Sequence, residues 1–198
     1  MESGVLFRNC NTHRTILMIV FMTEEPSMRV TLETLITRFF PQRLKDRDWM
    51  ISTFSGKSDL EENIPLKMLG WKWGNPFFII LRDADGSDCV ALKEHLAELA
   101  HPCGPEYKIR VVCQELESWF IGDCEAVRKA YPRCIFSNET KRYRDPDRLT
   151  NASEELSKLT GDRTKGHRAK SISVHLDPSR NCSPSFQVLF ETLQKHLG

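Results

Sequence analysis

Short apolar runs alternate with amphipathic stretches along the first two thirds of the chain. Four runs rich in β-branched and aromatic residues predict strands, which we place at Ile16–Met22, Trp49–Phe54, Phe77–Leu81 and Ile109–Cys113. Between them, apolar residues recur at helical spacing and predict three helices, at Ser27–Phe39, Ser58–Trp73 and Ser87–Ala100. Strands and helices that alternate at this length favour a mostly parallel sheet with helices on both faces, joined by right-handed crossovers. The predicted fold class is therefore α/β.

Local signals predict how these helices begin and which face they bury. Ser27 can cap the first helix, and the second opens with the Ser58-x-x-Glu61 pattern of a capping box. The third helix is expected to turn one apolar face toward the core, formed by Val90, Leu92, Leu96 and Leu99.

The pattern changes after residue 130. A polar, turn-rich segment covers residues 131–148, and helices are expected near 151–160 and 183–197. We therefore divide the chain into an N-terminal extension (1–14), an α/β core (15–130) and a basic segment with C-terminal helices packed on that core (131–198). The sequence has no linker long enough to mark a second independent domain.

Charge is spread unevenly along the 198 residues, although the net charge is only +1. Residues 126–181 hold 13 Lys and Arg against 7 Asp and Glu, an excess of six positive charges that leaves the rest of the chain at −5. An acidic half beside a basic flank is what a polyanionic substrate requires. The alternative is an ordinary solvated surface.

Cysteine usage and the N-terminal apolar run favour a cytoplasmic protein with no membrane partner. The seven cysteines are an odd number without a C-x-x-C pair, so we expect reduced, mostly buried thiols rather than a disulfide framework or a zinc ribbon. The apolar run at Thr15–Met22 is too short to span a bilayer, and Thr23-Glu24-Glu25 follows where a signal peptide would have small residues.

Motifs for several other functions are missing from the sequence. None of the six histidines has the H-x-x-x-H or H-E-x-x-H spacing of a zinc site. The complete Walker pattern Gly-x-x-x-x-Gly-Lys-Ser/Thr is absent, because Ile51 stands where its first glycine would precede Gly56-Lys57-Ser58. There is also no Gly-x-Ser-x-Gly elbow, so both a P-loop NTPase and an α/β serine hydrolase are disfavoured. If ATP is involved, we expect a partner protein to supply its site.

Acidic residues follow two of the predicted strands. Glu24 and Glu25 come directly after the first strand, and Asp83 and Asp85 come directly after the third. In an extended chain, residues i and i+2 face the same side, so Asp83 and Asp85 can point into one volume while Gly86 allows the turn. Carboxylate oxygens are the ligands that Mg²⁺ prefers, and Mn²⁺ can replace it. The acids therefore predict a metal site, with helix caps and solvated turns as the alternative.

Two further acids follow the fourth strand. Glu115 and Glu117 can extend the acidic group, and a second metal ion would require such extra carboxylates. The alternative is that one of them begins a helix that carries Trp119 and Phe120 into the core. Asp88 either supports the metal or begins the helix after the third strand, and we favour the helix role.

Basic residues of the C-terminal part are candidates for nucleic-acid contact, namely Lys141, Arg142, Arg144, Arg148 and Arg168. Lys165 or Arg168 could also neutralise charge that develops on a scissile phosphate. As an alternative, Asp145 and Asp147 make local salt bridges that order the segment.

The chain resembles a known family over residues 15–197. An apolar strand ending in Glu, then a helix, and later a strand ending in Asp-x-Asp, is similar to the Toprim domain of topoisomerases, primases and OLD-type nucleases. The closer resemblance is to the bacterial Toprim-like family called domain of unknown function 4276. It is carried by four segments, at residues 23–28, 81–85, 115–119 and 143–149.

This resemblance implies roles for the acids. Glu24 matches a glutamate that acts as general acid or base or as a metal ligand, and Asp83 and Asp85 match a Mg²⁺-binding pair. Many Toprim domains have Gly after this glutamate, where this chain has Glu25, so the key glutamate stays open between Glu24 and Glu25.

The expected function is a Mg²⁺-dependent nuclease that hydrolyses DNA or RNA with water as the attacking group, in bacterial defence against phage. Glu24, Glu25, Asp83, Asp85 and Lys165 are the expected catalytic residues. The alternative is a non-catalytic Toprim-like subunit that binds nucleic acid and an ATPase partner.

Overall fold

A four-stranded sheet forms the centre of the protein. The structure is a computed structural model that describes residues 17–198. Its strands, all parallel, lie in the order β2-β1-β3-β4 and span Leu17–Thr23 (β1), Trp49–Thr53 (β2), Asn75–Asp83 (β3) and Glu106–Val112 (β4). The predicted α/β class and parallel sheet are confirmed. The N-terminal extension at 1–14 and Cys10 lie outside the described residues.

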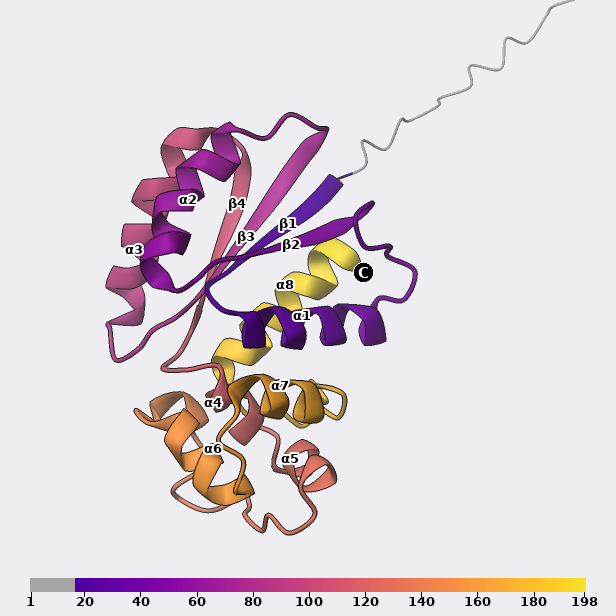
Figure 1. The fold of residues 1–198 in the computed structure, drawn as a ribbon, viewed down its shortest axis with the longest axis vertical. Coiled ribbons are helices and arrows are strands. Elements are labelled where there is room, and N and C mark those ends of the chain that lie inside the picture. The colour runs from indigo at the N-terminus through magenta and orange to yellow at the C-terminus, as the bar shows by residue number, and fades with distance from the viewer. Residues whose placement is uncertain (1–16) are drawn as a thin grey trace, which may run out of the picture.

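Helices cover both faces of the sheet (Figure 1). One face carries α1 (Pro26–Phe39) and α8 (Pro184–Leu197), and the other carries α2 (Lys57–Leu69) and α3 (Cys89–Ala100). The chain moves from β1 to β2 in one direction, and then from β2 past β1 to β3 in the other. Right-handed crossovers place α1 and α2 on opposite faces because the direction reverses.

The sheet has one apolar core on each face, and successive residues of a strand point alternately into the two cores. Ile19 and Phe21 pack toward α1 and α8, whereas Val20 and Met22 pack toward α2 and α3. β3 follows the same rule, and its five apolar residues from Phe77 to Leu81 are almost fully buried. A continuous apolar run of this kind is typical of a central strand in a parallel sheet that is covered on both sides.

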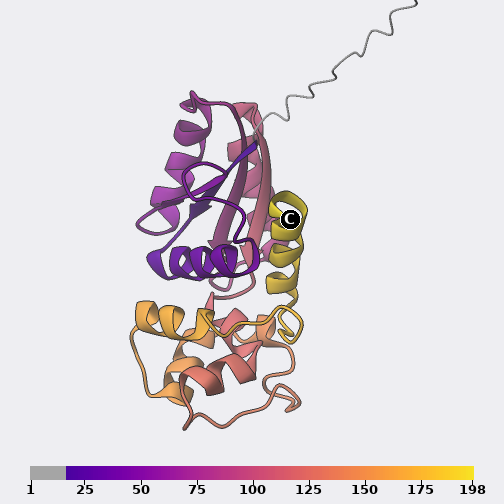
Figure 2. The ribbon, with the colours of Figure 1, turned by 90° about the vertical axis from the view of Figure 1, so that its right-hand side faces the viewer.

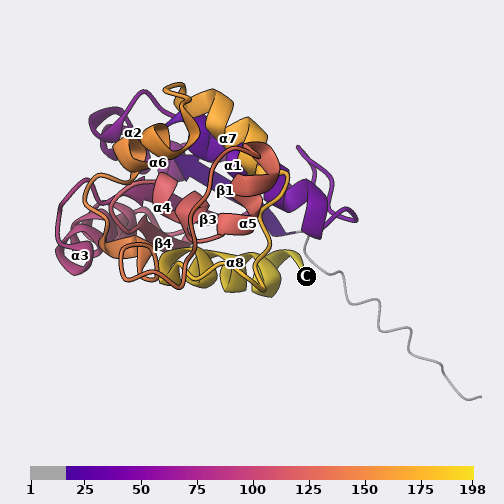
Figure 3. The same cartoon turned by 90° about the horizontal axis from the view of Figure 1, so that it is seen from below.

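Four short helices gather at the carboxyl ends of the strands (Figures 1 and 2). They are α4 (Glu117–Ile121), α5 (Cys124–Ala130), α6 (Ala152–Thr160) and α7 (Lys165–Ser173). Two 3-10 turns, His101–Cys103 and Pro146–Arg148, complete the helical elements of the described chain. Viewed from below, α7 runs beside α1, and α4 lies under β3 and β4 (Figure 3). The helices therefore close the end of the sheet where the predicted acids lie.

Several local predictions are wrong. Ser27 lies inside α1, whose cap is Glu25, because Pro26 is already helical. The capping box at Ser58 does not form, since α2 begins at Lys57 after Gly56, whose φ of 104° favours glycine. Val90 is 65% exposed, because it faces a surface groove rather than the core.

The thiol prediction holds only in part. All six described cysteines are free, but Cys103 and Cys134 alone among them are buried, and the other four are partly exposed. The apolar run near the N-terminus forms β1 in the centre of the sheet. Across residues 17–198, no helix has the length and apolar character needed to cross a membrane.

Candidate functional site

The predicted acids meet where the connections of two neighbouring strands diverge. β1 continues toward α1 on one face of the sheet, and its neighbour β3 continues toward α3 on the other. In open parallel sheets this switch point is where ligands bind. Six carboxylates are near it, and we call them the acidic cluster: Glu24, Glu25, Asp83, Asp85, Glu115 and Glu117.

Glu24 links the ends of β1 and β3. Its Oε2 accepts a hydrogen bond from the backbone N–H of Asp83 at 3.2 Å and lies 3.9 Å from Nε of Arg82. Burial raises the pKa of Glu24, and the neighbouring Asp85 carboxylate adds to the effect. Since the Arg82 guanidinium is also paired with Glu61 on α2, it only partly compensates Glu24.

Asp83 is the last residue of β3, and in the acidic cluster only Glu117 is more deeply buried. It is 4% exposed, and its Oδ1 is buried without a hydrogen-bond partner. Burial raises the pKa of Asp83 well above its usual range, and the carboxylates of Glu25, Glu24 and Glu117 raise it further. A buried carboxylate oxygen that lacks a donor is costly unless something else pairs with it.

Asp85 is placed differently from the prediction. The extended chain ends at Asp83, and Asp85 adopts a left-handed conformation with a φ of 47°. Its backbone N–H donates to the carbonyl of Gln114 at 2.9 Å, and Gly86 completes the turn with a φ of 79°. The i, i+2 argument therefore fails for this pair. Asp85 is exposed at the rim, yet it remains close enough to Glu24 and Glu115 to raise the pKa of both.

Glu25 faces a cation from a distant part of the chain. Lys165, the first residue of α7, places Nζ at 3.4 Å from Glu25 Oε2, and Ser27 Oγ donates to the other oxygen. Burial alone would lower the pKa of Lys165, but the carboxylates of Glu117, Glu25 and Asp83 outweigh it and raise the pKa. Lys165 therefore stays positively charged at neutral pH and lies against the acidic cluster, while its catalytic role stays a prediction.

Glu115 and Glu117 hold the short helices in place. Glu115 Oε2 accepts from the backbone N–H of Ser153 at 2.8 Å, and Glu117 Oε1 accepts from Ser153 Oγ at 3.1 Å. Arg168 Nη2 donates to Glu117 Oε1 at 2.6 Å and to Ser153 Oγ at 2.8 Å. Glu117 is the first residue of α4, which carries the buried Trp119 into the core, so the alternative helix role is confirmed for it.

One oxygen of Glu117, Oε2, is buried without a partner. Burial also raises the pKa of Glu115. Glu115 and Glu117 thus each use one carboxylate oxygen to hold α6 and α7. The other oxygen of each residue takes no part in these hydrogen bonds.

The predicted nucleic-acid contacts are dispersed. Arg168 is 1% exposed and is held by Glu117, so in this conformation it is not available to a phosphate. Arg142 pairs through two nitrogens with Glu155, and Arg148 pairs with Asp145 at 2.9 Å, which confirms one of the expected local salt bridges. Two other candidates are exposed and make no ion pair within the described chain, Lys141 and Arg144.

The role of Asp147 differs from the salt bridge that we expected. Its carboxylate accepts from Ser183 Oγ at 2.6 Å and from the Ser185 backbone N–H at 2.7 Å, at the beginning of α8. Asp88 caps α3 by accepting from the backbone N–H groups of Val90 and Ala91, which confirms the helix role that we favoured for it.

Sequence reasoning missed a polar hollow beside the acidic cluster. It has a volume of about 750 Å³ and is lined by Glu115, Ser153, Lys158, Arg163 and others from α6 and the loop that follows it. Ser153 is the residue that joins Glu115, Glu117 and Arg168, and one serine near the beginning of a predicted helix gives no signal of such a role.

The donors of the acidic cluster fit a hard divalent cation. All are carboxylate oxygens, and two of them, Asp83 Oδ1 and Glu117 Oε2, are buried and unpaired. Among residues 17–198, no three His, Cys, Asp or Glu side chains form a ready set of metal ligands, so the carboxylates would have to turn to hold an ion. The chemistry of the donors and the unpaired oxygens supports the fit.

These features define a parallel α/β protein with an acidic switch-point site closed by short helices. Residues 23–194 match the model of the family described as "Domain of unknown function (DUF4276)", and the chain belongs to this family. The match confirms the predicted family, whereas the wider similarity to Toprim domains stays a prediction. No curated protein and no solved structure matches the chain.

Proposed function

We propose that this protein is a divalent-metal-dependent phosphodiesterase that acts on DNA or RNA, with Mg²⁺ or Mn²⁺ as the ion. The observation that carries the proposal is the unpaired, buried Oδ1 of Asp83 at the switch point, surrounded by other carboxylates. The Leu116 backbone N–H donates to this carboxylate, but its Oδ1 has no donor. An acid that binds a cation leaves an oxygen free for it.

The balance of charge supports this proposal. Within residues 17–198, the six carboxylates of the acidic cluster form ion pairs with three basic side chains, Arg82, Lys165 and Arg168. The raised pKa values of Glu24, Asp83 and Glu115 reflect burial together with this uncompensated negative charge. A divalent cation would relieve the repulsion and would let the carboxylates ionise.

A polyanionic substrate is supported by the polar hollow. Lys158 and Arg163 line it together with Glu115, so cationic groups lie directly beside the acidic cluster. Phosphates along a nucleic-acid strand can bind to such groups while one phosphate reaches the acids. Arg163 is exposed and makes no ion pair within the described chain, so it is better placed for this contact than Lys158, Arg142 and Arg148, which are already paired.

The roles of the residues follow from their positions. Asp83, Glu24 and Asp85 would hold the ion, which stabilises negative charge on the phosphate when it is bound. Of the two glutamates, Glu25 is drawn to Lys165, while Glu24 contacts Asp83, so we favour Glu24 as the metal ligand. Glu25 is then the group that takes or returns a proton.

The basic residues have distinct roles in this proposal. Lys165 would neutralise charge at the reacting phosphate, because it is cationic and lies against the acids. Arg168 acts through Glu117 and Ser153, which fix α6 and α7 beneath the site. Arg168 is therefore a positioning residue.

A cleavage assay tests the proposal. The full chain is incubated with plasmid, single-stranded DNA and tRNA in Mg²⁺, in Mn²⁺ and in EDTA. We expect cleavage of at least one substrate with metal only, and a loss of 100-fold or more in Asp83→Asn, which keeps the shape of the side chain. Glu62→Gln, an exposed acid on α2 away from the acidic cluster, is the matched control and should cleave like wild type.

Isothermal titration with Mn²⁺ measures metal binding separately from cleavage. Binding to wild type that is lost in Asp83→Asn, without cleavage of any substrate, would favour the non-catalytic alternative that binds nucleic acid and an ATPase partner. Neither binding nor cleavage would overturn the proposal. A role in defence against phage and an ATPase partner stay predictions that rest on the resemblance.

A further inference from the structure

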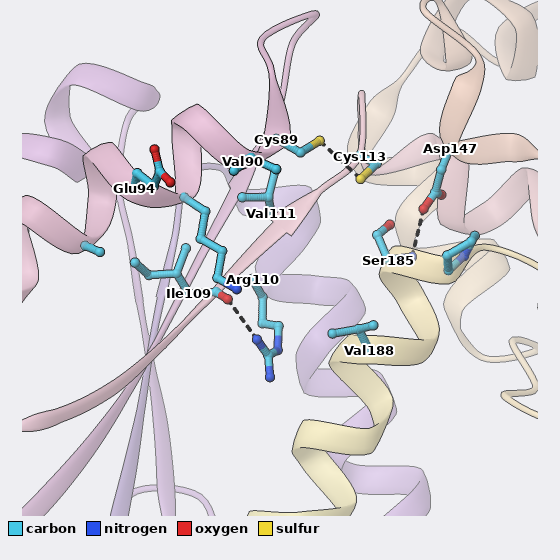
Figure 4. Close-up of a pocket in the computed structure, with 13 residues that line it drawn as sticks. Cys89, Val90, Glu94, Ile109, Arg110, Val111, Cys113, Asp147, Ser185 and Val188 are labelled. Carbon is cyan, nitrogen blue, oxygen red and sulfur yellow. Dashed lines mark hydrogen bonds between the residues drawn. The ribbon is translucent and has the colours of Figure 1, made fainter.

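A surface groove lies beside the open edge of the sheet (Figure 4). It shares no lining residue with the polar hollow. It has a volume of about 580 Å³ and lies between α3, the edge strand β4 and the first turn of α8. Val90 and Val188 line it and are 65% and 45% exposed. The groove admits small solutes to the residues at its upper end, which are two cysteines.

Cys89 and Cys113 face one another there (Figure 4). Cys89 is the first residue of α3 and Cys113 directly follows β4, and their Sγ atoms are 3.2 Å apart. Both are partly exposed, unlike the buried Cys103 and Cys134. Two thiols that are in contact and that solvent can reach are candidates for oxidation to a shared disulfide.

We propose that Cys89 and Cys113 form a reversible oxidation site, which a hydroperoxide converts from a thiol pair to a disulfide. The Cys89 sulfur, as thiolate, attacks one peroxide oxygen, so the O–O bond breaks and a sulfenic acid forms, while the other oxygen leaves and takes up a proton to become water or an alcohol. The Cys113 sulfur then attacks the sulfenic sulfur. The S–O bond breaks, the S–S bond forms, and water leaves with the Cys113 proton.

The order of the two steps follows from the environment of Cys113. Burial raises the pKa of the Cys113 thiol to about 12, and its contact with Cys89 and the charge of Asp147 contribute. Cys113 therefore stays protonated at neutral pH and is a poor nucleophile toward peroxide. It is suited to the second step, in which its partner is already oxidised and in contact.

The location gives the bond a structural effect. The loop that leads into Cys89 carries Asp85, and the loop that leaves Cys113 carries Glu115. These loops are already joined by the hydrogen bond from the Asp85 backbone N–H to the Gln114 carbonyl. A disulfide would tie them covalently and restrict the rim of the acidic cluster. The proposal goes beyond the phosphodiesterase activity and does not rest on it.

Thiol counting and peptide mapping test the proposal without any assay of activity. Reduced full-length protein is titrated with hydrogen peroxide, and free thiols are counted after denaturation. Wild type should lose two of its seven thiols first. Digestion with trypsin and a glutamate-specific protease separates Cys113 from Cys124, because Glu115 and Glu117 lie between them. A peptide pair joined through Cys89 and Cys113 should appear and should vanish on addition of dithiothreitol.

Matched variants decide the outcome. Cys89→Ser and Cys113→Ser should each abolish the joined peptides, whereas Cys124→Ser, another partly exposed cysteine, should keep them. The thermal midpoint of oxidised wild type should rise above that of the reduced protein, and neither Cys89→Ser nor Cys113→Ser should show this rise. The proposal is overturned if peroxide oxidises other cysteines of wild type while Cys89 and Cys113 remain unlinked, or if the link forms only after the protein has unfolded.

Discussion

Arg168 Nη2 donates a hydrogen bond to Glu117 Oε1 across 2.6 Å, and both side chains are almost completely excluded from solvent. The pair connects α7 to the beginning of α4, and Ser153 on α6 contacts both partners. Three short helices are thus held by one buried ionic group. A buried ion pair adds little stability compared with an apolar replacement, but the loss of one partner leaves an uncompensated charge inside the protein.

We therefore expect Arg168→Met to lower the free energy of unfolding by about 3–5 kcal/mol, because the Glu117 carboxylate would be left buried without its cation. Urea denaturation followed by circular dichroism measures the change. Lys158→Met, which breaks an exposed pair with Glu154, should cost less than about 1 kcal/mol. The double variant Glu117→Gln, Arg168→Met should recover part of the loss, and equal losses in the single and double variants would contradict this account.

Asp83 should lower the stability of the metal-free protein at neutral pH. Its pKa is raised by burial and by the neighbouring carboxylates, so the folded state resists ionisation of Asp83. The stabilisation associated with its protonated form is present at low pH and is lost as the pH rises through the folded-state pKa.

Asp83→Asn removes this titration. In EDTA, we expect the variant to be more stable than wild type at neutral pH, by roughly 1–3 kcal/mol, the usual cost of an unpaired buried polar group. The difference should grow as the pH rises, and thermal unfolding at a series of pH values measures it. An Asp83→Asn protein that is less stable than wild type at every pH would show that Oδ1 of Asp83 has a partner.

Divalent metal should make wild type more stable than Asp83→Asn, the reverse of the order expected in EDTA. We expect millimolar Mn²⁺ to raise the thermal midpoint of wild type by several degrees and to leave Asp83→Asn unchanged, because binding to the folded state alone stabilises it. The effect should weaken as the pH falls, since protons then compete with the ion for Asp83. Ca²⁺ and Mg²⁺ can be compared in the same scan, and the control Glu62→Gln should respond like wild type.

The stability that Asp162 contributes should depend on pH in the opposite direction from that of Asp83. Burial alone would raise its pKa, but hydrogen bonds from Tyr131 Oη at 2.6 Å, from His167 and from the Thr164 backbone N–H outweigh burial and hold the pKa at about 2. Its stabilising effect is complete above the unfolded-state pKa near 4 and is lost as the pH falls through the folded-state value.

Asp162→Asn should lower the free energy of unfolding by about 1–3 kcal/mol at neutral pH. The deficit should shrink between pH 4 and pH 2, where wild-type Asp162 becomes protonated as well. Tyr131→Phe removes a single donor and should cost about 1 kcal/mol, with a weaker dependence on pH. A deficit that stays constant down to pH 2 would mean that the pKa of Asp162 is not depressed.

The sheet and its covering helices could be predicted because their patterns are local. β3 is a continuous apolar run, and α2 buries Leu60, Ile64 and Met68 at the expected helical spacing. The polar α7, by contrast, has no apolar stripe and was missed. It is held by contacts that no local pattern reveals, such as those from Arg38 Nη1 to the carbonyls of Ser173 and Leu176.

The candidate site could be predicted only as a set of strand ends. The positions of Glu24 and Asp83 followed from the parallel topology, which brings carboxyl ends to one edge. The left-handed turn at Asp85, the burial of Arg168 and the bridging by Ser153 depend on α4 to α7, whose arrangement follows from tertiary packing. The contact between Cys89 and Cys113 belongs to the same group, since the two residues lie 24 positions apart.

The acidic cluster also has a consequence for how the chain reaches its native state. Its members come from the carboxyl end of β3 and from the segments that follow β1, β3 and β4, and Lys165 lies 140 residues from Glu25. Parallel strands pair only after their crossovers have formed, so the carboxylates are brought together late in folding. Their mutual repulsion is felt only in nearly complete molecules. Neutral replacements within the acidic cluster should therefore slow unfolding more than they speed the early steps of folding.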